Sequence, residues 1–168
     1  FLLRRQRQMC IRDRRNTMTA SPTPARLLGF GGLIPFVVTA VSVLTLSDNG
    51  QLMALDIMLH YSAVILSFLG AVHWGAGLTS FTEQYVSQSE NWIRIGWSVT
   101  PALVAWLAIQ MTLLPSLITF ILGFAGAFIF DAWSGKKGWL PSWYIKLRKS
   151  LSLIVCICLA LVFVEIRF

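Results

Sequence analysis

Charged side chains are scarce in this chain of 168 residues. Asp, Glu, Lys and Arg make up 12% of it, whereas hydrophobic residues make up 56%. A soluble domain is closer to one quarter charged, and a soluble chain with so few polar residues could not cover its own surface. The composition therefore excludes an ordinary soluble domain and indicates a chain that is solvated by lipid.

Residues that carry enzyme or metal chemistry are also few. The chain has two histidines and three cysteines, and it contains no GxSxG, CxxC, HExxH or phosphate-loop pattern. His60 and His73 fall in one predicted helix, about 20 Å apart along its axis, so they cannot bind a single haem or metal ion. We therefore predict no catalytic residue, no metal site and no cofactor.

The first residues differ in origin from the rest. The segment QMCIRDR, residues 8–14, back-translates to a DNA sequence that contains the transposase end used in sequencing libraries. We therefore expect residues 1–17 to be translated adapter and the protein to start at Met18; the alternative is a native basic arm that binds anionic lipid or nucleic acid. This segment holds six of the 14 basic and one of the 7 acidic residues, so without it eight and six remain and the net charge falls from +7 to +2. That charge gives no support to nucleic acid as a partner.

Five apolar segments are long enough to cross a membrane as helices, which takes about 20 residues each. They cover residues 27–46, 57–78, 93–114, 116–133 and 150–166. Each is longer than the roughly ten-residue strand of a membrane barrel, and backbone polar groups in lipid have to be satisfied internally. The sequence therefore predicts an all-α integral membrane bundle of five transmembrane helices, in a single domain over residues 18–168.

Basic residues predict the orientation of this bundle. An odd number of spans places the two termini on opposite sides of the membrane. With the N-terminus inside, only Arg167 lies outside, and seven basic residues lie inside: Arg26, Arg94, Lys136, Lys137, Lys146, Arg148 and Lys149. Because basic residues concentrate on the inner side of membranes, we predict an inside N-terminus and an outside C-terminus.

Three side chains of interest are expected near the inner end of the bundle: His73, Trp74 and Asp131. Ionisable groups inside a membrane are costly and usually face a partner or a cavity. We therefore expect Asp131 to accept a hydrogen bond from His73, which would link the second and fourth predicted helices. Two interpretations stay open: a site that handles protons or a ligand, and an interhelical clamp worth about 1 kcal/mol. We favour the clamp, because polar pairs between membrane helices are often only structural.

Asp56 and His60 form a weaker pair near the outer end of the second predicted helix. Their spacing of four residues puts them on one helix face. Two such groups can contribute to a metal site, but two ligands are too few to define one. We interpret them as an exposed pair at the membrane interface.

The connection before the last predicted helix is both basic and aromatic. In KKGWLPSWYIKLRK, the residues that characterise it are Trp139, Trp143, Tyr144, Lys146, Arg148 and Lys149. Such a segment anchors a helix at the interface, and it can also bind anionic lipid head groups. We favour anchoring and keep lipid binding as the alternative.

Three motifs resemble those of a known family. SFLGAVHWG in the second predicted helix, FDAW at the end of the fourth and LPSWYIKLRKSLSL entering the fifth resemble the transmembrane protein 69 family, a domain of unknown function. The likeness runs from about Pro24 to Glu165. It implies a five-helix protein of the bacterial inner membrane and supplies no reaction. Its signature positions correspond to His73, Trp74, Asp131, Trp143, Tyr144 and Arg148.

Three hypotheses for function follow, in order of preference. The first is a non-enzymatic protein that packs against lipids or binds a membrane protein partner, for instance in assembly of a complex. The second is a proton-coupled carrier that uses His73 and Asp131 and therefore needs a water-reachable cavity beside them. The third is an enzyme that handles a lipid or a quinone at the inner interface.

Overall fold

The computed structural model describes residues 22–80 and 88–168, and every regular element in these two ranges is a helix. The predictions for residues 1–17 and for Met18 lie outside the described residues. The helices are α2 (Thr23–Gly31), α3 (Ile34–Thr45), α4 (Asp48–Ser80), α5 (Gln88–Ile109), α6 (Leu113–Lys136) and α7 (Ser142–Arg167). Five stretches are long and apolar enough to cross a membrane, with α2 and α3 together forming the first. The all-α bundle of five transmembrane helices is thus confirmed.

The first span, predicted as one helix over residues 27–46, is divided into α2 and α3. The break falls at Gly32 and Leu33, just before Pro35, which has no N–H to donate to the preceding turn. The carbonyl oxygen of Gly32 accepts a hydrogen bond from the Tyr61 hydroxyl of α4 at 2.9 Å. A side chain of the neighbouring helix therefore satisfies a backbone group at the break, as lipid surroundings require.

The other predicted boundaries need correction. The segments 57–78 and 150–166 are the apolar parts of the longer helices α4 and α7, because polar turns at the ends of these helices continue the same backbone geometry. The segment 93–114 ends too late, since α5 stops at Ile109. The next helix, predicted over residues 116–133, begins at Leu113 and includes Pro115 in its first turn, where proline is tolerated. The turn between α5 and α6 is therefore formed by residues 110–112.

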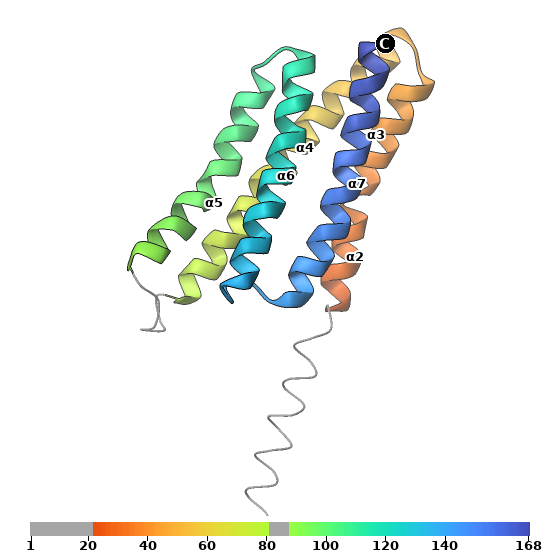
Figure 1. Ribbon diagram of the computed structural model, residues 1–168. Coiled ribbons are helices and arrows are strands. Elements are labelled where there is room, and N and C mark those ends of the chain that lie inside the picture. Colours follow the sequence, from red (N-terminus) through yellow and green to blue (C-terminus); the bar gives the residue numbers. More distant parts are fainter. Residues whose placement is uncertain (1–21, 81–87) are drawn as a thin grey trace, which may run out of the picture.

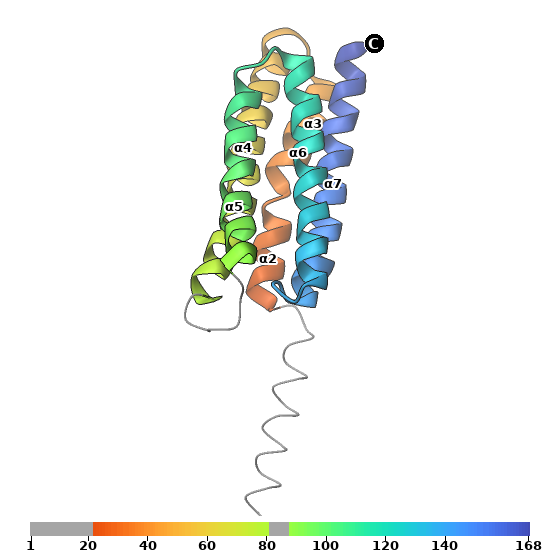
Figure 2. The ribbon, with the colours of Figure 1, turned by 60° about the vertical axis from the view of Figure 1, so that its left-hand side comes forward.

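The helices form one bundle in which α5 lies on one side, α2, α3 and α7 lie on the other, and α4 crosses obliquely behind α6 (Figure 1). A second view shows α5, α6 and α7 running side by side along its length (Figure 2). The centre is filled by large side chains that are at most 1% exposed, among them Phe36, Phe120 and Phe124. Phe36 meets the rings of Tyr61 and Phe124 edge to face, which is a favoured aromatic geometry. This core fixes α3, α4 and α6 relative to one another.

Helices α4 and α5 are in close contact at Gly70. A Cβ atom at this position would collide with the backbone carbonyl oxygen of Ser98 and lie 3.1 Å from the Pro101 ring. Only glycine allows this contact, which is how small residues bring membrane helices together. Pro101 lies inside α5. Gly70 comes three residues before His73, so the close contact positions the part of α4 that carries the histidine.

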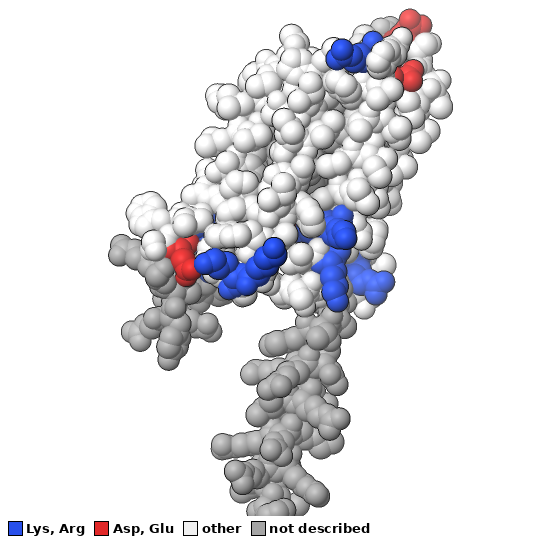
Figure 3. Space-filling model, viewed as in Figure 1, with Lys and Arg blue, Asp and Glu red and all other residues white. Residues whose placement is uncertain are grey.

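Charge is distributed unevenly between the two ends of the bundle. Basic residues gather where α2, α5 and α7 begin and α6 ends, and the apolar middle separates them from the opposite end (Figure 3). We call the former the basic end; it is defined by Arg26, Arg94, Lys136, Lys137, Lys146, Arg148 and Lys149. The opposite end carries Asp48, Asp56, Glu165 and Arg167. The separation matches the basic cluster that the sequence predicted for one side of the membrane.

Candidate functional site

Three ionisable side chains from three helices meet inside the bundle near its basic end. His73 lies seven residues before the end of α4, Asp131 lies five before the end of α6, and Arg148 follows the start of α7 by six. At a rise of about 1.5 Å per residue, all three are about 8–11 Å inside their helix ends. They therefore lie at one depth. We call this group the buried cluster.

Asp131 is the centre of the buried cluster because both of its oxygens are used. His73 donates its Nε2–H to Oδ1 at 2.7 Å, and Arg148 donates its Nε–H to Oδ2 at 2.9 Å. The three residues are 1%, 1% and 5% exposed. An ionised carboxylate only accepts hydrogen bonds, so Nε2 of His73 carries the proton of this contact. The charges of Asp131 and Arg148 thus compensate each other and link α6 to α7, while His73 adds α4.

Aromatic rings close one side of the buried cluster. The Phe130 ring meets the His73 ring edge to face, with centroids 5.0 Å apart. The Trp97 ring of α5 stacks on the Phe130 ring, with centroids 4.2 Å apart. The centroid of the Trp133 ring lies 5.3 Å from that of Phe130. The Phe130 ring thus contacts both the His73 ring and Trp97 of α5. A low-dielectric wall of this kind strengthens the hydrogen bonds that it encloses.

Several buried polar atoms around the cluster have no hydrogen-bond partner among residues 22–80 and 88–168. They include Nδ1 of His73, Nη2 of Arg148 and the hydroxyl oxygens of Ser134, Tyr144 and Ser152. Tyr144, Arg148 and Ser152 follow one another at intervals of four on α7, so they share one face of this helix. Each unsatisfied polar atom in an apolar interior costs about 1–3 kcal/mol. The cluster therefore retains hydrogen-bonding capacity beyond the contacts that hold it together.

The structure brings His73 and Asp131 together, as the sequence analysis expected, but it places Trp74 elsewhere. Trp74 is 46% exposed, because the residue after an inward-facing position in a helix is rotated about 100° away from it. Trp74 is therefore not part of the buried cluster.

The residues of the predicted interfacial segment also differ in how far they are exposed. Lys146 and Lys149 are exposed, Trp139, Trp143 and Tyr144 are partly buried, and Arg148 is buried. The interpretation of Arg148 as an interfacial residue is thus wrong. The signal that reveals its role is its spacing: Tyr144, Arg148 and Ser152 form a polar face that leads away from the exposed lysines and into the apolar part of α7.

Asp56 and His60 lie at the surface of α4. The His60 Nδ1 atom is 3.3 Å from Asp56 Oδ1 and 2.8 Å from the Asp56 carbonyl oxygen. Their side chains are 73% and 59% exposed. Among the described residues, no group of three or more His, Cys, Asp or Glu side chains is placed to hold a metal ion. The pair is a local contact within one turn of helix.

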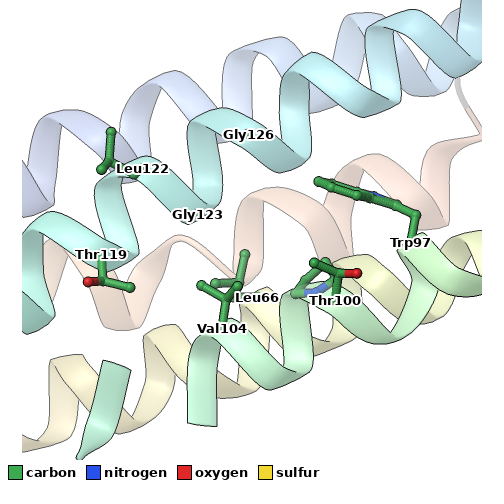
Figure 4. Close-up of a pocket in the computed structure, with 9 residues that line it drawn as sticks. Leu66, Trp97, Thr100, Val104, Thr119, Leu122, Gly123 and Gly126 are labelled. Atoms are coloured by element: carbon green, nitrogen blue, oxygen red, sulfur yellow. The ribbon is translucent and has the colours of Figure 1, made fainter. Parts of the chain in front are cut away.

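A separate cavity of about 330 Å³ lies between α4, α5 and α6 (Figure 4). It is lined by Leu66, Trp97, Thr100, Pro101, Val104, Thr119, Leu122, Gly123 and Gly126. Its two hydroxyl groups donate to carbonyl oxygens of their own helices, Thr100 to Gly96 and Thr119 to Pro115. The cavity therefore offers an occupant mainly apolar contact, and its lining includes neither His73 nor Asp131.

Fold and cluster together define an α-helical, multi-pass membrane protein with a compensated ion pair between its helices. The chain belongs to the family described as "Protein of unknown function (DUF3429)", which matches residues 21–164. It is also 31% identical over 136 residues to Transmembrane protein 69 of Xenopus tropicalis, an alignment that covers 80% of this chain and 51% of that protein. The chain thus spans about half the length of this curated relative. No solved structure matches it significantly.

The resemblance drawn from the three motifs is confirmed by these comparisons. All three motifs fall within the matched residues, and each of them supplies one residue of the buried cluster. His73 comes from SFLGAVHWG and Asp131 from FDAW, whereas Arg148 comes from LPSWYIKLRKSLSL. The residues that carry the likeness are therefore also the residues that tie α4, α6 and α7 together.

Proposed function

We propose that this chain is a non-enzymatic membrane protein that works by packing against partner membrane proteins, as an assembly or scaffold subunit does. The observation that carries this proposal is the buried cluster. The Arg148 cation binds the Asp131 carboxylate, and the carboxylate also accepts a hydrogen bond from His73. This is the arrangement of a structural clamp. A rigid bundle of this kind suits a protein whose outer surface is its working part.

The outer surface supports the same proposal. In the most apolar window of each span, only 28–39% of residues are buried inside the bundle. Large apolar side chains such as Phe68, Leu122 and Ile129 are more than 60% exposed. Such a surface has to be covered by lipid or by apolar helices of another membrane protein. Most of each span is thus available for contacts outside the chain.

The test is whether a second membrane protein accompanies the chain when it is extracted together with its surrounding lipid. We expect polymer-extracted particles to contain one further membrane protein in constant ratio, and we expect chemical cross-links from exposed positions of the spans to reach it. A monomer in every mild extraction, with no reproducible cross-link, would overturn the proposal.

A second candidate function is a proton-coupled carrier, and one observation favours it. Nδ1 of His73 and Nη2 of Arg148 are buried polar atoms with unused hydrogen-bonding capacity, which a passing water chain or a polar substrate would use. In proteoliposomes that contain a pH-sensitive dye, this candidate predicts proton flux that His73→Gln abolishes. Equal dye responses for wild type, His73→Gln and empty vesicles would leave the assembly proposal in place.

We further propose that the basic end faces the cytoplasm and that the protein lies in a bacterial inner membrane. The support is the charge separation between the two ends of the bundle, since basic residues concentrate on the cytoplasmic side. A reporter that is active only outside the cytoplasm, fused after Phe168, should be active, and a fluorescent protein fused there should stay dark. The reverse pattern would invert the assignment.

A further inference from the structure

The face of α6 that lines the cavity between α4, α5 and α6 carries aromatic residues and a lysine beyond it, toward the basic end. Thr119, Gly123 and Gly126 line the cavity. Continuing from Gly126 in steps of four, three and four residues leads to Phe130, Trp133 and Lys137, which is the spacing of one helix face. The Lys137 Nζ atom lies 5.7 Å from the centre of the Trp133 ring. An apolar hollow, an aromatic strip and a cation therefore follow one another along α6.

Glycines keep the α6 wall of this cavity open. A Cβ atom at Gly126 would meet no other atom within 4 Å, whereas one at Gly123 would come within 2.8 Å of the end of the Leu66 side chain, which would have to move. Trp97 reaches from α5 across the end of the cavity that is nearer the basic end (Figure 4). A volume of about 330 Å³ is at the lower end of the range for small-molecule sites. The space suits a flexible apolar chain.

The distance from the cavity to the cation fits one class of ligand. Eleven residues separate Gly126 from Lys137, about 16 Å along the helix. This is close to half of the hydrocarbon thickness of a bilayer, about 15 Å. A phospholipid whose phosphate meets Lys137 at the interface thus has the ends of its acyl chains at the depth of Gly126, the residue of α6 that lines the near end of the cavity.

Lys137 is also available to a head group. Its side chain is 47% exposed, and its contact with Glu90 is a surface pair of 3.6 Å, which contributes little and exchanges easily. Lys136 stands next to it and is exposed. Adjacent lysines at a membrane surface attract anionic lipid.

From this match of depth, charge and lining we propose that the α4–α5–α6 cavity binds one acyl chain of an anionic phospholipid whose phosphate contacts Lys137. The site goes beyond the proposed function, since it requires no protein partner. It is also distinct from the buried cluster. Its cation, Lys137, belongs to the basic and aromatic segment KKGWLPSWYIKLRK, and the new element is the cavity that takes the acyl chain.

The first experiment fills the cavity and counts lipid. Purified protein is mixed with dioleoyl phosphatidylglycerol or dioleoyl phosphatidylcholine, and bound lipid is counted by native mass spectrometry. Gly126→Leu should weaken phosphatidylglycerol binding about tenfold, the equivalent of roughly two methylenes displaced from the site. Gly75→Leu is the matched control, because a Cβ atom at Gly75 also meets nothing within 4 Å and this glycine does not line the cavity. It should bind lipid as wild type does.

The second experiment tests the head group. Lys137→Gln should weaken phosphatidylglycerol binding about fivefold, as expected for the loss of one cation near the surface, and should leave phosphatidylcholine binding unchanged. Lys149→Gln removes an exposed lysine from α7 and should have a smaller effect.

Three outcomes would overturn the site. The first is unchanged phosphatidylglycerol binding in Gly126→Leu with an unchanged melting temperature. The second is equal binding of the two lipids by wild type. The third is loss of a protein partner, without loss of lipid, in Gly126→Leu particles extracted from membranes, which would assign the cavity to a partner helix. Because the lipid counts use the purified chain, their failure leaves the assembly proposal untouched.

Discussion

Helix α4 carries both histidines of the chain, and each of them meets an aspartate in a different setting. His73 reaches across to Asp131 of α6 at 2.7 Å, with side chains that are 1% and 2% exposed. His60 contacts Asp56 of its own helix at 3.3 Å, with side chains that are 59% and 73% exposed. The first pair joins separate helices in an apolar interior, whereas the second joins neighbours that formation of the helix already brings together.

Both contacts join a histidine to an aspartate, so the difference in their energies comes from burial and not from the types of residue. Water screens an exposed ion pair and competes for its hydrogen bonds, so such pairs contribute about 0–1 kcal/mol. A buried charge that loses its partner keeps its full desolvation penalty. The comparison therefore predicts large effects at Asp131 and small effects at Asp56 for the same chemical change.

The largest effect is expected for Asp131→Asn. This change keeps the size of the side chain but leaves the Arg148 charge uncompensated in the interior, so the free energy of unfolding should fall by about 3–5 kcal/mol. Unfolding in detergent micelles, followed by circular dichroism, measures it. Asp56→Asn is the control and should stay within about 0.5 kcal/mol of wild type. Equal losses in the two variants would show that burial does not govern these pairs.

A smaller effect is expected where α4 is held against α5, three residues before His73. Gly70→Ala puts a methyl group against the Ser98 carbonyl oxygen, and the resulting separation of α4 from α5 should cost about 1–3 kcal/mol. Gly75→Ala adds the same methyl group in open space and should stabilise α4 slightly, since alanine favours helix more than glycine does. A Gly70→Ala protein as stable as Gly75→Ala would contradict the close contact.

The smallest effect is expected at the histidines. His73→Ala removes one hydrogen bond between helices and should cost about 1–2 kcal/mol, the upper part of the range for such bonds in membranes. Asp131 keeps Arg148, so the loss stays below that of Asp131→Asn. His60→Ala should be close to neutral in the same unfolding measurement. If His60→Ala cost more than His73→Ala, the two pairs would have been assigned the wrong roles.

The existence and order of the spans could be predicted from sequence because lipid demands long apolar runs, and such runs are visible residue by residue. The break at Gly32 and Leu33 could not, because the run of apolar residues continues through it. Gly31, Gly32 and Pro35 are the residues near this position that weaken or interrupt a helix. The boundaries of α5 and α6 were misplaced for a related reason: the turn at residues 110–112 lies between two apolar segments and contains no strong turn residue.

The meeting of His73 with Asp131 could be predicted from depth alone, since both residues lie a similar number of positions from the basic end. The place of Arg148 could not be predicted in this way. It stands among Lys146 and Lys149, and counting charges assigns all three to the membrane surface. Arg148 differs from the two lysines in the direction of its side chain, because it shares a helix face with Ser152 rather than with Lys146 and Lys149. Packing of α7 against α6 then decides which cation enters the bundle.

The most direct test of the clamp is a double-mutant cycle between Asp131 and Arg148. Asp131→Asn and Arg148→Met each leave one charge of the pair without its partner, whereas the double variant removes both charges. We predict that the double variant is more stable than Asp131→Asn alone, with a coupling energy of about 2–3 kcal/mol. If the two losses simply added, to within about 0.5 kcal/mol, the ion pair would not be what holds α6 to α7, and the buried cluster would have to be explained by a role other than a clamp.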